Sequence, residues 1–565
     1  MTQAPAERCT LAAYKREFAG RHLLGGVIRK WAAEKPESPA IINATRNEQV
    51  DWRTLEAVST GLAVELLRLG FRKGDFLAAS LPLTNEHIFL EYACFRIGVI
   101  HTPLDLRLKP AEVLKCLQMV RARGYAFPGR TPAADFRELG RAVKAHCPFV
   151  EHLIQFSPEE DAIEGAAPIG AFLGPGKAAS AGMRRACAEA APGVTEYDGA
   201  QAIFTTGSTG APKPALLSHR GITVQNLCLG AAFGFDEGTR MLVNLPPSHV
   251  GAQAEILMTT LFWGGTAVTL EVFDAAKSLE AIERHRVNLV GQIPAMFNME
   301  WRLSNYAGYD LSSLKAAVYG GQQVARPFLE KLAAMAPRIA TGLGLTETSG
   351  FCTYTPLSSD AGEAAASLGH AMPVYPMTIR EPMREDGTAG GELPEGEAGH
   401  VCFRGPQTFL GYVNDPEATA RTISRDGWLY TGDMGHVSSK GLHFAGRAKW
   451  VIKPAGYQVF PGEVESAICA LEEKVAGCGV VGAPHAVRSE AIVAFVERRP
   501  GAGLTAAELK QHARSMASFL RPLHFVILEP GQMPLNRVAK IDYMRLQQMA
   551  LEEVGRLREQ RRWDR

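Results

Sequence analysis

Residues 203–213 read Ile-Phe-Thr-Thr-Gly-Ser-Thr-Gly-Ala-Pro-Lys, a strand-like ending followed by a glycine-rich loop. The loop carries two glycines, four hydroxyl side chains and a lysine, namely Gly207, Gly210, Thr205, Thr206, Ser208, Thr209 and Lys213. Glycines allow a tight turn that points backbone N–H groups at one anion, and the hydroxyls and the lysine add further donors. The composition predicts a phosphate-binding loop, because a merely flexible Ser/Gly turn does not need so many donors.

Two familiar kinds of phosphate loop do not fit this sequence. A Walker loop needs Gly-Lys-Ser/Thr, but Pro212 precedes Lys213 and Pro214 follows it. A dinucleotide fingerprint needs Gly-x-Gly-x-x-Gly, and its nearest candidate, which starts at Gly342, has Glu347 in place of the last glycine. The prediction of a phosphate-binding loop therefore rests on neither of these two motifs.

The sequence around the loop alternates helical and strand-like patterns. Leucines and a valine between residues 55 and 69 recur every three or four positions and stop at Gly70, which predicts a helix. Further helices are predicted at 86–97 and 275–285, and short strands at 76–81, 98–105, 266–272 and 287–293. Helices between short buried strands indicate βαβ units and parallel sheets.

The last part of the chain has its own pattern of helices and strands. Helices are predicted at 462–470 and 506–516, and strands at 475–481, 491–497 and 525–528, enough for a small α+β domain. Three other stretches are expected at the surface: an excursion at 159–193, a turn-rich segment at 382–397 and a solvated terminal helix at 551–565.

The composition limits the kind of protein. The 565 residues suggest about three to four folding units, or a large domain with a smaller one. With 60 basic and 59 acidic residues, a surface built for nucleic acid or an anionic membrane is not expected. Ten cysteines without a Cys-x-x-Cys pair indicate reduced thiols rather than a disulfide framework or a zinc site. We expect a cytoplasmic protein without a signal peptide or a membrane span.

Five segments, in order along the chain, resemble the motifs of the adenylate-forming (ANL) superfamily, the family of acyl-CoA synthetases and AMP-dependent ligases. They lie at residues 205–213, 342–347, 429–433, 446–457 and 534–540. The resemblance implies an α/β fold: a large N-terminal domain of βαβ-rich subdomains, with parallel sheets and a distorted barrel, and a small mobile α+β C-terminal domain. It places the domains at 1–448 and 449–565, with Lys449 as the hinge.

The resemblance also implies the chemistry. A carboxylate attacks the α-phosphate of ATP and releases pyrophosphate, and the acyl group then passes from AMP to a thiol. Glu347 would hold Mg²⁺ and Thr346 the α-phosphate, since a hard cation prefers carboxylate oxygen. The remaining nucleotide contacts would come from Asp433 on the ribose, Arg447 beside it, and Lys540 between carboxylate and phosphate.

Other positions would line the acyl, adenine and thiol sites. His249 resembles an aromatic gate beside the acyl channel, and Gly321 and Gln322 resemble the segment between the acyl and adenine pockets. An aliphatic Leu343, between Gly342 and Gly344, replaces the usual aromatic residue next to adenine. The resemblance also implies that Lys453, Gly456 and Tyr457 line the site where the thiol of coenzyme A enters.

Three differences from known relatives narrow the range of carboxylic acids that the enzyme could activate. Residues 246–251 contain no carboxylate, which disfavours an α-amino acid. Val250 replaces the asparagine of dihydroxybenzoate-activating relatives, which disfavours a 2-hydroxyaryl acid. Gly344 replaces the tryptophan of acetate-activating relatives, so the acid should be larger than propionate.

The leading hypothesis is an ATP- and Mg²⁺-dependent acid–CoA ligase. An acyl-AMP ligase that loads a carrier protein is the alternative enzyme, and a catalytically silent nucleotide-binding regulator is the alternative from another class. Glu347, Asp433 and Lys540 argue against the silent regulator. Ala455 stands where luciferases have a lysine, which argues against light emission. The expected partners are the acid, ATP and CoA, and a homodimer is left open.

Overall fold

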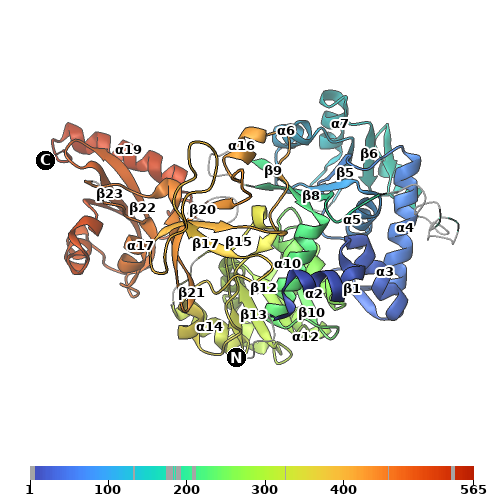
Figure 1. Ribbon diagram of the computed structural model, residues 1–565, viewed down its shortest axis with the longest axis horizontal. Helices are drawn as coiled ribbons and strands as arrows, with labels where there is room; N and C mark the ends of the chain where they lie inside the picture. Colours follow the sequence, from blue (N-terminus) through green and yellow to red (C-terminus); the bar gives the residue numbers. More distant parts are fainter. Residues whose placement is uncertain are drawn as a thin grey trace. The chain divides into compact units, whose positions relative to one another are not determined.

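The computed structural model describes residues 7–131, 134–173, 182, 185, 193–205, 212–322, 324, 326–455, 457–535 and 541–564. The chain forms two compact units (Figure 1). The first combines Met1–Met377 with Phe403–Leu429, and the second combines Thr378–Cys402 with Tyr430–Arg565. The domain boundary expected at 448/449 stays a prediction.

The first unit contains an eight-stranded sheet. In spatial order its strands are β19 (Gly411–Tyr412), β9 (Lys213–Ser218), β8 (Gly199–Thr205), β4 (Ile100–Pro103), β3 (Phe76–Ala79), β5 (Gly124–Pro128), β6 (His152–Phe156) and β7 (Ala166–Pro168). Strands from β8 to β7 pair in parallel, whereas β8–β9 and β9–β19 are antiparallel. The edge strand β7 lies within the stretch expected to be only a surface excursion.

A second, seven-stranded sheet completes this unit. Its order is β14 (Ile339–Ala340), β13 (Ala316–Tyr319), β12 (Leu289–Gln292), β10 (Arg240–Val243), β11 (Thr266–Thr269), β1 (Pro39–Asn43) and β2 (Glu48–Asp51). All its neighbours pair in parallel except β1 and β2. A short hairpin joins β15 (Gly344–Leu345) to β16 (Gly350–Phe351).

Helices cover these sheets, and α3, α4 and α5 also pack against one another (Figure 1). The helices of the first unit are α2 (Leu11–Glu17), α3 (Leu24–Glu34), α4 (Trp52–Arg68), α5 (Asn85–Ile97), α6 (Pro110–Val120), α7 (Arg137–His146), α8 (Gly170–Leu173), α10 (His219–Phe233), α11 (Thr259–Phe262), α12 (Ala275–His285), α13 (Pro294–Trp301), α14 (Arg326–Met335), α15 (Ala361–Ala365) and α16 (Pro416–Ala420), with a π-helix at Gly251–Met258.

Local sequence explains the boundaries of α4. The Asp51 side chain accepts a hydrogen bond from the Thr54 backbone N–H and caps the first turn. Leu55 and Leu62 are buried on one face of the helix. Gly70 follows with a φ of 91°, a left-handed conformation that glycine adopts without strain. The helix expected from the leucine spacing is therefore confirmed.

The second unit is built from two sheets. One has the order β17 (Met377–Arg380), β18 (Gly399–Phe403), β20 (Leu429–Ser438) and β21 (Gly441–Arg447), and the other has β22 (Val475–His485), β23 (Ser489–Arg498) and β24 (His524–Leu528). Its helices are α17 (Pro461–Cys469), α18 (Ala506–His512) and α19 (Tyr543–Glu559). The α/β fold with parallel sheets and a small C-terminal domain is confirmed.

The terminal helix differs from its expected solvated state. Helix α19 buries Leu546, Ala550, Val554 and Leu557, which repeat at helical spacing, and Trp563 beyond its end is also buried. These side chains form one apolar cluster with strands β22 and β23. Within the described residues, no helix is long and apolar enough to cross a membrane.

Candidate active site

The glycine-rich loop connects two antiparallel strands. Its first residue, Thr205, ends β8 and pairs with Lys213, the first residue of β9. The Thr205 hydroxyl donates to the Lys213 carbonyl at 3.4 Å. Positions 206–211, which include Thr206, Gly207, Ser208, Thr209 and Gly210, lie outside the described residues. The strand pairing nevertheless brings both ends of the expected phosphate loop to one place.

Tyr412 links Lys213 to Glu347, although the three residues are far apart in the sequence. The Lys213 ammonium lies 5.1 Å from the centre of the Tyr412 ring. The Tyr412 hydroxyl donates a hydrogen bond of 2.6 Å to Glu347 Oε1. The edge position of β19, next to β9, produces this arrangement. The carboxylate expected to hold a metal therefore connects directly to the base of the phosphate loop.

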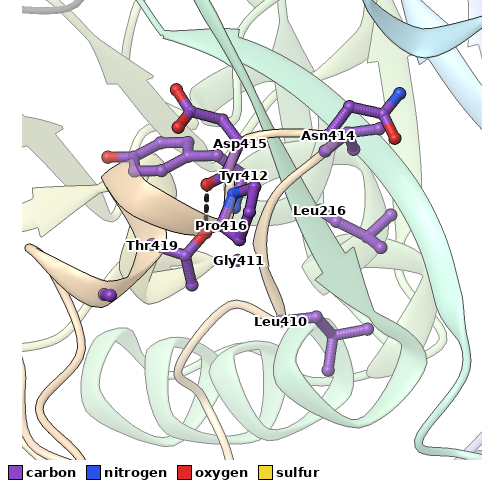
Figure 2. A pocket seen from close by; sticks show the side chains of 10 residues that line it. Leu216, Leu410, Gly411, Tyr412, Asn414, Asp415, Pro416 and Thr419 are labelled. Atoms are coloured by element: carbon purple, nitrogen blue, oxygen red, sulfur yellow. Dashed lines mark hydrogen bonds between the residues drawn. The ribbon is translucent and has the colours of Figure 1, made fainter.

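A shallow pocket opens beside Tyr412 (Figure 2). It has a volume of about 430 Å³ and is lined by Leu216 and by residues 410–416, 419 and 420. The Thr419 hydroxyl accepts from the Tyr412 backbone N–H at 2.9 Å and donates to the Asp415 carbonyl at 2.9 Å. These bonds fix the backbone of β19 and with it the direction of the Tyr412 ring.

A tight turn presents Glu347. Thr346–Thr348 form a single 3₁₀ turn, and Ser349 follows in the left-handed region with a φ of 55°. The buried Gln407 side chain donates to the carbonyls of Thr348 and Phe351, at 2.8 and 2.5 Å. These bonds hold Thr346 and Glu347 at the head of the β15–β16 hairpin, both half-buried.

One position just before this turn has no room for a side chain. A Cβ atom on Gly342 would lie 1.9 Å from the Thr353 carbonyl oxygen, so only glycine fits. The Leu343 backbone N–H donates to the Thr353 hydroxyl at 2.9 Å. Gly344, in contrast, is exposed. Whether Leu343 contacts adenine stays a prediction.

The expected acyl-pocket residues lie in loops at the ends of parallel strands. His249 follows β10, is half-buried and lies two residues before the first residue of the π-helix. Burial by itself would raise the pKa of the nearby Asp105 carboxyl. Hydrogen bonds from Arg107 and the positive charge of His249 outweigh that effect, so the pKa of Asp105 lies below its usual value. Gly321 and Gln322 follow β13 and are exposed, and Gly321 has a φ of 90°. The carboxyl ends of parallel strands are the usual place for ligand sites.

In the second unit, Asp433 and Arg447 lie directly opposite each other on β20 and β21. Arg447 Nε lies 2.9 Å from Asp433 Oδ1, and Asp433 is 1% exposed. The Arg447 guanidinium also donates to the Thr431 carbonyl at 3.3 Å. A buried carboxylate is stable only with such partners, so the pair forms one preorganised polar group.

The remaining residues expected to act in the second unit lie nearer its surface. Burial and the neighbouring Arg447 lower the pKa of Lys449 to about 8, and its ammonium lies 4.3 Å from the Trp450 ring centre. Lys453 is exposed, and Tyr457 is 57% exposed and stacks on Phe519. Gly456 and Lys540 lie outside the described residues.

The side chains around Glu347 are compatible with a bound Mg²⁺ ion. Among the described residues, no group of three or more His, Cys, Asp or Glu side chains could hold a metal by itself. Mg²⁺ needs no such group, because it commonly binds one or two carboxylates together with substrate phosphates and water. The Glu347 carboxylate beside the phosphate loop fits that requirement.

No sequence pattern predicts Tyr412 or Gln407 as residues of the site. Tyr412 and Gln407 are ordinary residues of a Gly- and Pro-containing segment, and they gain their roles only through contacts with residues more than fifty positions away.

Comparisons with known proteins identify the family of this chain. Residues 28–413 match the model of the AMP-binding enzyme family, and residues 463–540 match that of the AMP-binding enzyme C-terminal domain. The chain is 30% identical over 497 residues to 4-coumarate–CoA ligase-like 6 of Oryza sativa subsp. japonica, covering 83% of this chain and 77% of the relative. It is 28% identical over 511 residues to 4-coumarate–CoA ligase 5 of the same plant, covering 87% and 88%.

Two solved structures share the fold. An anthranilate CoA ligase in complex with anthranoyl-AMP gives a TM-score of 0.79 at 20% identity, covering 94% of this chain and 98% of that one. An amide bond synthetase from Marinactinospora thermotolerans gives a TM-score of 0.78 at 24% identity, covering 94% and 100%.

Proposed function

We propose, from the premise that this chain belongs to the AMP-binding enzyme family and is an AMP-forming acid–thiol ligase, that it joins a carboxylic acid larger than propionate to coenzyme A at the expense of ATP. The observation that carries the proposal is the contact of Tyr412 with both Lys213 and Glu347. It combines a phosphate-loop cation with a carboxylate suited to a metal–phosphate complex.

In the first half-reaction, a carboxylate oxygen of the acid forms a bond to the α-phosphorus of ATP, and the bond to pyrophosphate breaks. Two anions must approach each other, so cations and N–H donors lower the barrier most. Lys213 and the loop after Thr205 would hold the phosphates, and Thr346 would donate to the α-phosphate. Mg²⁺ on Glu347 would neutralise part of the phosphate charge.

The second unit would supply the ribose contacts and the catalytic lysine. Asp433 would accept the ribose hydroxyls, and Arg447 would hold that carboxylate ionised and in place. Lys540 would bridge the attacking carboxylate and the α-phosphate. After pyrophosphate leaves, the thiol sulfur attacks the acyl carbon and AMP departs; Lys453, Gly456 and Tyr457 would then line the path of CoA.

The decisive experiment measures pyrophosphate release across a panel of acids, with ATP and Mg²⁺. We expect release with at least one acid larger than propionate, and formation of its thioester when CoA is the only acceptor. Adenylate without thioester would favour the acyl-AMP ligase that loads a carrier protein. No release with any acid would favour the silent regulator.

Lys540→Ala separates the two half-reactions. The lysine charge acts only when ATP and carboxylate meet, so the loss should fall on kcat of adenylation. Thioester formation from supplied acyl-AMP should survive better than the full reaction. Equal loss of both half-reactions would contradict the role of Lys540 in the first half-reaction.

Location in the cytoplasm and a homodimer stay predictions from the sequence.

A further inference from the structure

The chain just before helix α19 is fixed on both sides of the expected catalytic lysine. The Asp542 backbone N–H donates to the Pro534 carbonyl at 2.9 Å, and Leu535 forms an antiparallel bridge with Ile541. The residues between these contacts include Lys540 and lie outside the described residues; we call them the Lys540 segment. The two contacts determine where this segment begins and ends.

A hydrogen bond anchors the chain after the Lys540 segment to helix α17. Tyr543 is the first residue of α19, and its hydroxyl donates to Glu465 Oε1 at 2.7 Å. The same oxygen accepts from the Val480 backbone N–H, on β22, at 2.9 Å. Burial and the nearby Glu465 carboxyl raise the pKa of the Tyr543 hydroxyl, so it keeps its proton and donates. One carboxyl oxygen thereby joins α17, β22 and the start of α19.

The ring of Tyr543 has a second partner, which lies directly after the expected hinge. Trp450 ends the 3₁₀ turn Ala448–Trp450, and its ring centre lies 5.6 Å from that of Tyr543, with an angle of 29° between the planes. Aromatic rings stacked at such a distance attract each other beyond the effect of the area they bury. The residue after Lys449 therefore packs on the residue three positions after Lys540.

This packing connects two parts of the chain that the proposed reaction uses separately. A rotation of the backbone at Lys449 moves whatever is rigidly attached to Trp450, because packed side chains shift together. The stack on Tyr543 and the bond to Glu465 attach the base of the Lys540 segment to Trp450. Neither aromatic residue has a role of its own in the proposed reaction, and both are half-buried.

We propose that Trp450 and Tyr543 are positioning residues that hold the Lys540 segment in a fixed place relative to the hinge at Lys449. The inference rests on the proposed function, because only the ligase reaction needs Lys540 beside the α-phosphate. Rotation about Lys449 then carries Lys540 to the nucleotide and away from it as part of one packed body. A charge that acts only in the adenylation transition state loses its effect after a small displacement, so the pair serves the first half-reaction.

Trp450→Ala removes the stack and tests this role. We expect kcat of adenylation, measured as pyrophosphate release at saturating ATP and acid, to fall roughly ten- to a hundredfold, with little change in either KM. Thioester formation from supplied acyl-AMP should stay near the wild-type rate. Trp450→Phe keeps an aromatic ring and should restore most of the adenylation rate.

Variants of Tyr543 separate the stack from the hydrogen bond. Tyr543→Phe keeps the ring and loses the bond to Glu465, so its loss of adenylation rate should be smaller than that of Tyr543→Ala. The double variant Trp450→Ala/Tyr543→Ala should be no slower than the slower of its two single variants, because both remove the same contact.

His443→Ala is the matched control in the same unit. His443 is half-buried, and its ring stacks on His436 with a centre-to-centre distance of 4.7 Å. This change removes an aromatic contact that lies outside the proposed coupling. It should leave the ratio of the two half-reaction rates as in wild type, even where it lowers the melting temperature.

The outcomes separate this inference from the proposed function. If wild type is active but Trp450→Ala adenylates at the wild-type rate, or loses both half-reactions equally at an unchanged melting temperature, the positioning role is refuted while the ligase activity stands. If wild type releases pyrophosphate with no acid, the proposed function fails. Amide hydrogen exchange at residues 541–545 then still tests the packing: faster exchange in Trp450→Ala supports it, and unchanged exchange overturns it.

Discussion

At the scale of single residues, the site depends on Tyr412. Its hydroxyl donates to Glu347, and its ring faces the Lys213 ammonium. A carboxylate that must bind a cation works best when one of its oxygens is fixed and the other is available. Tyr412 fixes one oxygen of Glu347 from a different strand, so we propose that it positions Glu347 for the metal.

Tyr412→Phe tests this role. The ring and its contact with Lys213 remain, but Glu347 loses the bond that orients it. We expect kcat for adenylation to fall roughly ten- to a hundredfold, in line with the loss of an outer partner of a metal ligand, and the Mg²⁺ concentration for half-maximal rate to rise.

The matched control is Tyr125→Phe, which removes another buried hydroxyl bond, 2.9 Å to the Ser80 hydroxyl. This change should lower stability by about 1 kcal/mol and leave the Mg²⁺ dependence as in wild type. An unaltered Mg²⁺ dependence in Tyr412→Phe would show that the tyrosine does not position a metal ligand.

At the scale of elements, antiparallel pairs carry the side chains that the proposed reaction needs. The β8–β9 pair closes the expected phosphate loop, the β15–β16 hairpin carries Glu347, and the β20–β21 pair sets Asp433 opposite Arg447. In each pair the register, rather than any single contact, fixes which side chains meet. Small changes of backbone position in these hairpins should therefore matter more than changes of surface charge.

Gly342→Ala tests the β15–β16 hairpin. The added methyl would lie 1.9 Å from the Thr353 carbonyl oxygen, which cannot move without shifting the hairpin. We expect a loss of stability of roughly 1–3 kcal/mol and a larger loss of adenylation rate, because Thr346 and Glu347 follow directly. Thermal unfolding and pyrophosphate release measure the two effects.

Gly308→Ala is the control for that change. No atom lies within 4 Å of the position that its new methyl group would take. It should leave both melting temperature and activity close to wild type. Should Gly342→Ala behave in the same way, the hairpin would not be the element that positions Glu347.

At the scale of the whole molecule, the proposed reaction needs the domains expected at 1–448 and 449–565 to serve two different half-reactions. We expect Lys449 to be the hinge between these two domains, because the resemblance places it between Arg447 and the residues that would serve CoA. Proline fixes φ near −65° and so restricts a hinge. Lys449→Pro should allow pyrophosphate release and strongly reduce thioester formation.

Lys449→Ala removes the charge but not the backbone freedom, so it controls for the loss of the ammonium. Thioester formation should persist in this variant. A wild-type rate of thioester formation in Lys449→Pro would rule out rotation about this residue.

A buried cluster of titratable side chains, His87, His101 and Glu91, should make the stability of the first unit depend on pH. His87 Nδ1 donates to the Pro82 carbonyl, and its Nε2 lies 3.3 Å from His101 Nε2. His101 Nδ1 in turn lies 3.3 Å from Glu91 Oε1, which also accepts from Gln201 at 2.8 Å. Because the Pro82 carbonyl can only accept, neutral His87 accepts at Nε2 and His101 donates there, so the Nδ1 atom of neutral His101 turns a lone pair rather than a proton toward the Glu91 carboxyl.

Burial raises the pKa of Glu91 from 4.5 to about 8, and lowers the pKa of His87 to about 4 and of His101 to about 3. As pH rises from 4.5 to 8, the unfolded chain loses the Glu91 proton before the folded protein does. The stability that the protonated carboxyl contributes is therefore fully present below pH 4.5 and is lost progressively up to pH 8.

Glu91→Gln keeps the shape and the donor of the protonated acid. As pH rises from 5 to 8, the free energy of unfolding of Glu91→Gln should increase relative to that of the wild-type protein, by up to roughly 1.4 kcal/mol per pH unit. Thermal unfolding at several pH values measures the trend, and the histidine contributions are common to both proteins and cancel. A constant difference between the two proteins at all pH values would show that Glu91 is ionised in the folded state.

The sequence by itself determined the local elements and the reaction class. Helix α12 has the bounds that its pattern predicts, because the Asp274 cap and the period of its apolar residues are properties of adjacent residues. The motifs are equally local, and the family match confirms the enzyme class. Only the tertiary structure showed that Tyr412 contacts Glu347 and that α19 is buried. These contacts depend on strand order and packing between distant segments, which no local pattern encodes.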